Sequence, residues 1–211
     1  MSARPAPLSA ASPGDQTWSH VAAFGALWGA LEITLGAFLH VMRLPLVGVL
    51  MASLGAMLLV AARQVYPRRG TTLATGVVAA LCKSISPGGI ILGPMIGIAT
   101  EGALVEAALL AAPRSRLCAV LAGVLCALWA AFQKLIMQVV FYGSDVLSLY
   151  LAALVRARKW LALPDDAGWW ALGLLLALLL LVGGGAGWVG RGVGQEAAEL
   201  LGQEEEAEEA P

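Results

Sequence analysis

Apolar stretches long enough to cross a bilayer follow one another through most of this chain. A membrane-spanning helix needs about 20 predominantly apolar residues. Of the 211 residues, 59% are hydrophobic, and the mean hydropathy of +0.81 is far above that of an ordinary soluble domain. The sequence therefore predicts an all-α integral membrane protein, with about six transmembrane helices in one bundle and no soluble catalytic domain.

Prolines, glycines and basic residues divide the apolar sequence into six expected spans. These spans cover residues 20–39, 46–62, 72–85, 95–112, 117–142 and 168–190. Together they form a transmembrane domain expected over residues 20–192, preceded by a disordered leader at residues 1–19. Half of the 14 acidic residues lie in the segment 193–211, which is expected to be a solvated, disordered tail.

Basic residues follow the second, fourth and last of these spans. Because cytoplasmic loops are enriched in Lys and Arg, an even number of spans with both termini in the cytoplasm is expected. Residues 144–163 fit less well, since a short apolar run is followed there by Arg156, Arg158 and Lys159. We expect an outward-facing interfacial helix at residues 144–163. A seven-span arrangement, which splits residues 117–155 into two crossings, stays open.

A carboxylate, Glu32, interrupts the first apolar run, residues 20–40. An ionisable group inside a span is a functional-site hypothesis by default. Gly25, Gly29 and Gly36 fall on the same side of the expected helix. Two interpretations stay open: Glu32 contacts a solute, or it is a structural partner of Lys134 that locks two spans together.

Other polar side chains also lie within the spans or at their ends. Desolvating them alone is costly, so they are expected to face a cavity or one another. The candidate solute-binding residues are Glu32, His40, Glu101, Gln133 and Lys134, with Trp28 and Trp129 available for stacking. The loop at residues 86–94 (SPGGIILGP) is a candidate wall of the same site.

Two further charged residues lie at the ends of their spans. Glu106 falls about 140° from Glu101 on a helix, so the two carboxylates do not share a face, and we expect Glu106 to be a structural or interfacial group and not a ligand. Lys83 ends the short third span, and two interpretations stay open: it faces a cavity or another polar group, or it extends towards the membrane interface.

Metal and cofactor chemistry is not indicated. Cys82, Cys118 and Cys126 have no CxxC spacing and fall in apolar segments, so they are expected to be buried free thiols. We predict no metal site and no cofactor, and we expect no nucleic-acid partner.

A ladder of small residues, Ala22, Ala26 and Ala30, lies beside Glu32 on the first span. Alanines at every fourth position allow another helix to approach closely. The ladder therefore predicts a partner-docking face on the first span.

With this ladder, the short-looped spans and the Gly/Pro-rich loop, the chain resembles, over about residues 20–190, the substrate-binding membrane subunits (S components) of energy-coupling factor transporters. The resemblance implies that Ala22, Ala26 and Ala30 dock on a separate transmembrane coupling subunit. It also implies separate ATPase subunits and a small-molecule solute, such as a vitamin or its precursor, bound at the outer end of the bundle. The chain has no GxxxxGK[ST] loop of its own. It also lacks the N-terminal Met-His arrangement of the nickel and cobalt branch, which disfavours metal uptake.

Besides membrane lipid and solute, the expected partners are thus transporter subunits, and the chain is not expected to be an enzyme. No GxSxG or HExxH motif is present. Two alternatives stay open: an intramembrane enzyme acting on lipid or peptide, and a membrane assembly subunit that transports nothing.

Overall fold

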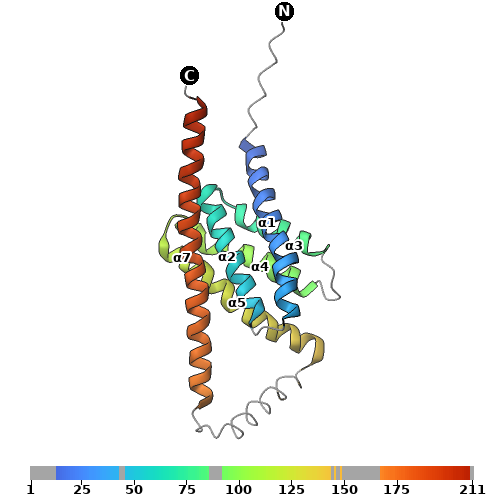
Figure 1. Cartoon of the computed structure of the whole chain (residues 1–211). Helices are drawn as coiled ribbons and strands as arrows, with labels where there is room; N and C mark the ends of the chain where they lie inside the picture. Colours follow the sequence, from blue (N-terminus) through green and yellow to red (C-terminus); the bar gives the residue numbers. More distant parts are fainter. Residues whose placement is uncertain are drawn as a thin grey trace, which may run out of the picture.

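The computed structural model describes residues 13–42, 46–85, 92–143, 145, 148 and 167–209. This part of the chain is helical throughout and contains no strand (Figure 1). Its helices are α1 (Pro13–Val41), α2 (Val47–Val65), α3 (Thr71–Lys83), α4 (Leu92–Leu110), α5 (Arg116–Tyr142) and α7 (Ala167–Glu209). The prediction of an all-α membrane bundle is confirmed.

Five of these helices, all except α3, are long and apolar enough to cross a membrane. The exception, α3, has 13 residues, which corresponds to a length of about 20 Å. The hydrocarbon core of a bilayer is about 30 Å thick. One of the six expected spans is therefore too short to cross the core unaided.

Helix α2 lies at the centre of the bundle and contacts α1, α3, α4, α5 and α7. Of its candidate membrane span, 72% is buried. Small residues on α2 allow this crowding, and Gly55 is the clearest case. A Cβ atom at Gly55 would lie 2.5 Å from the indole ring of Trp28, so the ring of α1 fits only against a glycine.

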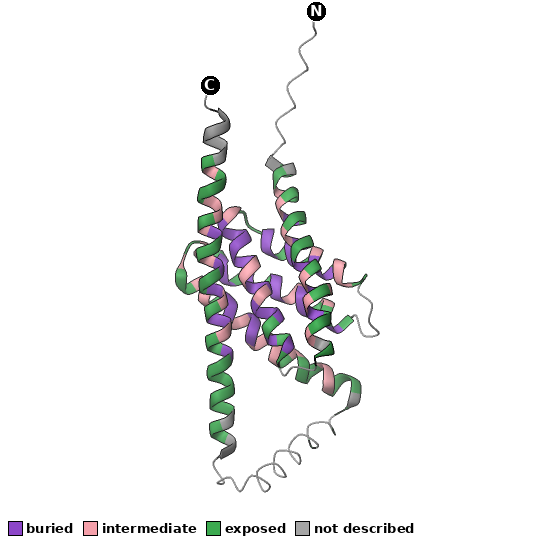
Figure 2. Ribbon diagram, viewed as in Figure 1, coloured by how far each residue is buried: buried purple, intermediate pink, exposed green. Residues whose placement is uncertain are grey.

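Glycines also bring other helix backbones close together. A Cβ atom at Gly76 of α3 would lie 2.9 Å from the Cα atom of Gly102 on α4. A Cβ atom at Gly187 of α7 would collide with the backbone carbonyl of Ala119 on α5. The buried residues of Figure 2 accordingly lie where the helices face one another in the middle of the bundle, whereas both ends of α7 are mostly exposed.

A buried polar cluster holds α2, α3 and α4 together at the end of the bundle where α1 begins. The Glu106 carboxylate accepts hydrogen bonds from the backbone N–H groups of Gly70 (2.7 Å) and Thr72 (3.2 Å) and from the Thr72 hydroxyl. It thus satisfies free N–H groups at the start of α3. Arg63 of α2 lies 3.5 Å from the same carboxylate. Glu106 is structural, as the sequence predicts.

Both ends of the described chain are more helical than expected. Helix α1 begins at Pro13, so residues 13–19 are not a disordered leader. The Thr17 and Tyr66 hydroxyl groups share a hydrogen bond of 2.9 Å. Helix α7 continues to Glu209, so the acidic segment is not a disordered tail up to that residue. Residues 1–12 and, apart from Asp145 and Ser148, the expected interfacial helix at 144–163 lie outside the described residues.

Candidate solute-binding cavity

A cavity of about 700 Å³ opens at the end of the bundle opposite the Arg63–Glu106 cluster. It lies among the C-terminal parts of α1, α3 and α5 and the N-terminal parts of α2 and α4. The lining residues are Glu32, Gly36, Val47, Gly48, Met51, Ala52, Lys83, Gly93, Pro94, Gly97, Ile98, Glu101, Ala130, Gln133, Lys134, Met137, Gln138 and Phe141. The cavity thus combines apolar walls with a few convergent polar groups, which is typical of small-molecule sites.

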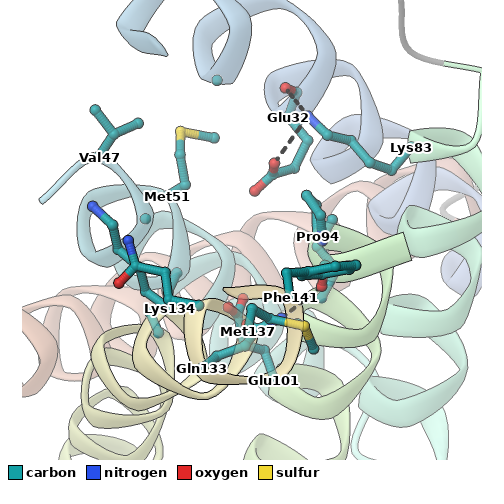
Figure 3. A pocket seen from close by; sticks show the side chains of 18 residues that line it. Glu32, Val47, Met51, Lys83, Pro94, Glu101, Gln133, Lys134, Met137 and Phe141 are labelled. Atoms are coloured by element: carbon teal, nitrogen blue, oxygen red, sulfur yellow. Dashed lines mark hydrogen bonds and ion pairs between the residues drawn. The ribbon is translucent and has the colours of Figure 1, made fainter. Parts of the chain in front are cut away.

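One wall carries an ion pair between α1 and α3. The Lys83 ammonium lies 3.4 Å from the Glu32 carboxylate and donates a hydrogen bond of 2.8 Å to the backbone carbonyl of Glu32. Figure 3 shows both contacts as dashed lines. The two side chains are only 10% and 15% exposed, so each charge compensates the other away from bulk water.

This pair bears on two alternatives that the sequence leaves open. The ion-pair partner of Glu32 is Lys83 and not Lys134, and Lys83 points into the bundle and does not extend to the interface. The reason is the register of two parallel helices. Gly29 of α1 packs directly on Cys82 of α3, so the short α3 ends at the level of Glu32 and places its last residue, Lys83, beside that carboxylate.

Deeper in the cavity lies a second carboxylate, Glu101 of α4. It is 6% exposed, and its Oε2 atom is buried without a hydrogen-bond partner among the described residues. Gly97, one turn earlier on α4, lines the cavity as well. Glu32 and Glu101 thus line one cavity.

Helix α5 contributes Gln133 and Lys134 to the opposite wall. The Gln133 amide donates a hydrogen bond of 2.6 Å to the backbone carbonyl of Gly93, and it packs so closely on Gly97 that a Cβ atom there would collide with it. Lys134 is exposed and has no ion-pair partner in the described part of the chain. The cavity therefore has a fixed amide in its wall and a solvated ammonium near its mouth.

The remaining candidates for the solute site are Trp28, Trp129 and His40. Trp28 is 1% exposed and lies in the core against Gly55, and Trp129 does not line the cavity. Neither indole therefore lines the described cavity wall, in which Phe141 supplies the aromatic side chain. The side chain of His40 lies outside the described residues.

The loop expected at residues 86–94 is only partly described. Residues 86–91 lie outside the described part. Gly93 and Pro94 belong to the first turn of α4 and line the cavity.

Sequence reasoning missed Lys83, Met51, Met137 and Phe141 as lining residues. For Lys83 the signal was present, because an apolar span shorter than a bilayer must end below the membrane surface or distort the bilayer. For the two methionines and Phe141 no such signal exists, since apolar side chains occupy every face of these helices.

The alanine ladder lies on the opposite side of α1 from the cavity. Ala22, Ala26 and Ala30 are exposed, whereas Glu32 and Gly36 are buried. Among the described helices, α1 contacts only α2 and α3. The ladder is thus an outward-facing strip on a peripheral helix.

Comparison with known proteins finds no matching family, no matching curated protein and no matching solved structure.

Proposed function

We propose that the protein is the substrate-binding membrane subunit of an ECF-type micronutrient importer in the inner membrane of a prokaryote. It captures a small polar organic solute, such as a vitamin or its precursor, and docks on a separate coupling subunit. The observation that carries the proposal is the 700 Å³ cavity with both acidic and basic groups in its wall, set within a bundle of membrane-spanning helices.

The size and chemistry of the cavity support solute capture. Small-molecule sites usually measure about 300–1,000 Å³ and combine apolar walls with few polar groups. Charged side chains within membrane spans commonly mark substrate pathways. Here Glu101 and the Glu32–Lys83 pair supply such groups, and Met51, Met137 and Phe141 supply apolar surface.

The position of the alanine ladder supports docking. Its three alanines face away from the bundle on a helix with few internal neighbours. Small side chains allow the backbone of a partner helix to approach closely. A coupling subunit seated there would contact α1, the helix that also carries Glu32 into the cavity wall, and ATP energy would come from associated ATPase subunits.

The surroundings of the two α4 carboxylates argue against the enzyme alternative. Glu101 faces the cavity, whereas Glu106 is bound by Arg63, Gly70 and Thr72 at the far end of the helix. The two carboxylates therefore cannot act together on one substrate.

Purification from the membranes of the native host tests the proposal. The wild-type chain is expected to carry with it a multi-span coupling protein and ATPases with a phosphate-binding loop, identified by mass spectrometry. Ala26→Leu adds bulk to the ladder and is expected to abolish this co-purification, while Ala103→Leu, at an exposed alanine on α4, leaves it intact. Partners without an ATPase would instead favour an assembly subunit, and turnover of lipid or peptide by the isolated chain would favour an enzyme.

A further inference from the structure

The strongest unexplained group in the structure is the Glu101 carboxylate. It lines the cavity, is 6% exposed, and leaves Oε2 without a partner among the described residues. Buried polar atoms in folded proteins almost always have a hydrogen-bond partner. A buried carboxylate oxygen that faces an open cavity is therefore suited to accept a hydrogen bond from a ligand.

The nearby donors of the described cavity wall are already engaged. The Lys83 ammonium contacts both the carboxylate and the carbonyl of Glu32. The Gln133 amide nitrogen donates to the Gly93 carbonyl. Neither nitrogen bonds the Oε2 atom of Glu101, which has no hydrogen-bond partner in the described part of the chain.

Lys134 lies too near the mouth of the cavity to pair with the Glu101 carboxylate. The Cys126 thiol lies 3.8 Å from the Glu101 backbone carbonyl, which puts these two residues at the same depth. Lys134 follows Cys126 by eight residues on α5, about 12 Å closer to the mouth, and its side chain is exposed. The deep end of the cavity thus carries a carboxylate without a nearby compensating cation in the described wall.

The neighbouring charges favour a cation at this position. Lys83 balances the charge of Glu32, and no described cation balances that of Glu101. Both carboxylates line the same cavity. A positively charged ligand group would give Glu101 both a hydrogen bond and an opposite charge, whereas an anion would meet two acidic side chains.

We propose that the solute enters amine-first: the cavity selects small organic molecules with a protonated amine, whose N–H group donates to Glu101. Ile98, Met51 and Met137 then pack around the apolar body of the solute. This inference rests on the proposed function in one respect, because it takes the cavity as the solute site. It adds the chemical class of the solute and the residue that recognises it.

Three probes of similar size, which differ in the group at the end of their side chain, test the inference. They are tryptamine (amine), tryptophol (hydroxyl) and indole-3-propionate (carboxylate). Binding to the purified full chain in detergent micelles is measured by equilibrium dialysis with quantification by mass spectrometry. A charge-assisted hydrogen bond corresponds to roughly tenfold or more in affinity, so tryptamine is expected to bind about tenfold more tightly than tryptophol, and indole-3-propionate most weakly.

Variants assign the selectivity to one residue. Glu101→Gln keeps the size of the side chain and removes its charge, so it is expected to weaken tryptamine binding about tenfold and to leave tryptophol binding nearly unchanged. Glu199→Gln, at an exposed carboxylate of α7, is the matched control and should change neither. Glu101→Met provides a second neutral replacement, and the probe order of the wild type is informative even where a variant fails to fold.

Equal binding of the three probes, tighter binding of the propionate, or no binding of tryptamine at millimolar concentration would overturn the amine assignment. None of these outcomes affects co-purification with ATPases, which tests the transporter proposal separately. Conversely, amine selectivity lost in Glu101→Gln, in a chain that recruits no ATPase, would sustain the inference and overturn the transporter proposal.

Discussion

The Arg63 guanidinium and the Glu106 carboxylate form an ion pair 3.5 Å apart, at the end of the bundle away from the cavity. Their side chains are only 1% and 10% exposed. Because Glu106 also binds the first N–H groups of α3, one carboxylate joins three helices at this end. The acidic residues of α4 thus have separate roles, with Glu106 stabilising the fold and Glu101 facing the cavity.

Removing Glu106 should therefore destabilise the protein strongly. Glu106→Ala leaves the buried Arg63 charge uncompensated, which costs about 3–5 kcal/mol. The double variant Glu106→Ala/Arg63→Met should regain part of this loss, because no buried charge is left unpaired, although the N–H groups of α3 remain unsatisfied. Unfolding of the purified proteins in detergent micelles measures both effects. A double variant as unstable as the single one would contradict the role given to the ion pair.

The contact between α7 and α5 should tolerate no side chain at Gly187. In Gly187→Ala the new methyl group collides with the Ala119 carbonyl, and overpacking of this kind costs about 1–3 kcal/mol or more. Gly185→Ala is the matched control on the same helix, because a Cβ atom there meets nothing within 4 Å. We expect a clear fall in the midpoint of thermal unfolding for Gly187→Ala only. A similar fall in both variants would indicate that helix contact is not the cause.

The Gln133 amide should keep its position in the cavity wall only while residue 97 is a glycine, because a Cβ atom there would collide with it. Gly97→Ala is expected to push the amide from its place, break its bond to the Gly93 carbonyl and narrow the cavity, so that tryptamine binding falls. Gly97→Ala/Gln133→Ala should restore binding by making room again. Gly36→Ala, at a cavity glycine where the nearest atom would lie 3.5 Å from the new Cβ, should bind normally. Failure of the double variant to recover would contradict the steric explanation.

The cavity should open to the outside of the cell. The basic residues Arg68, Arg69 and Arg114 are exposed at the opposite end of the bundle, and basic ends face the cytoplasm. In a chain whose native cysteines are replaced by alanine, Met42→Cys at the cavity end should react with a membrane-impermeant maleimide in intact cells. Arg69→Cys should react only after the cells are broken. The reverse pattern would place both termini outside.

The sequence predicts the helices of this bundle better than their rotation about their own axes. Runs of apolar residues are enough to locate the spans, and the angle between Glu101 and Glu106 correctly separates their surroundings. The partner of Glu32 depends instead on the contact of Gly29 with Cys82. Such a contact sets the register between two helices, and no pattern within either helix reveals it.

Two other misplaced expectations have similar physical causes. The sequence around Trp28 is compatible with a place in a ligand site or in the core. Its place in the core depends on Gly55 of α2, which has no side chain and so leaves room for the indole ring. In the acidic C-terminal segment the charge pattern suggests disorder, yet Glu, Ala, Leu and Gln are strong helix formers. Helix α7 therefore continues beyond the span into the segment that was expected to be a tail.

The shortness of α3 has a consequence for passage across the membrane. Its 13 residues span about 20 Å, roughly 10 Å less than the hydrocarbon core. Where α3 ends, the cavity begins, with Lys83 in its wall. If the chain acts in the proposed importer, a solute bound at Glu101 has already passed part of the membrane thickness by diffusion, and the ATP-dependent step has to move it only through the rest.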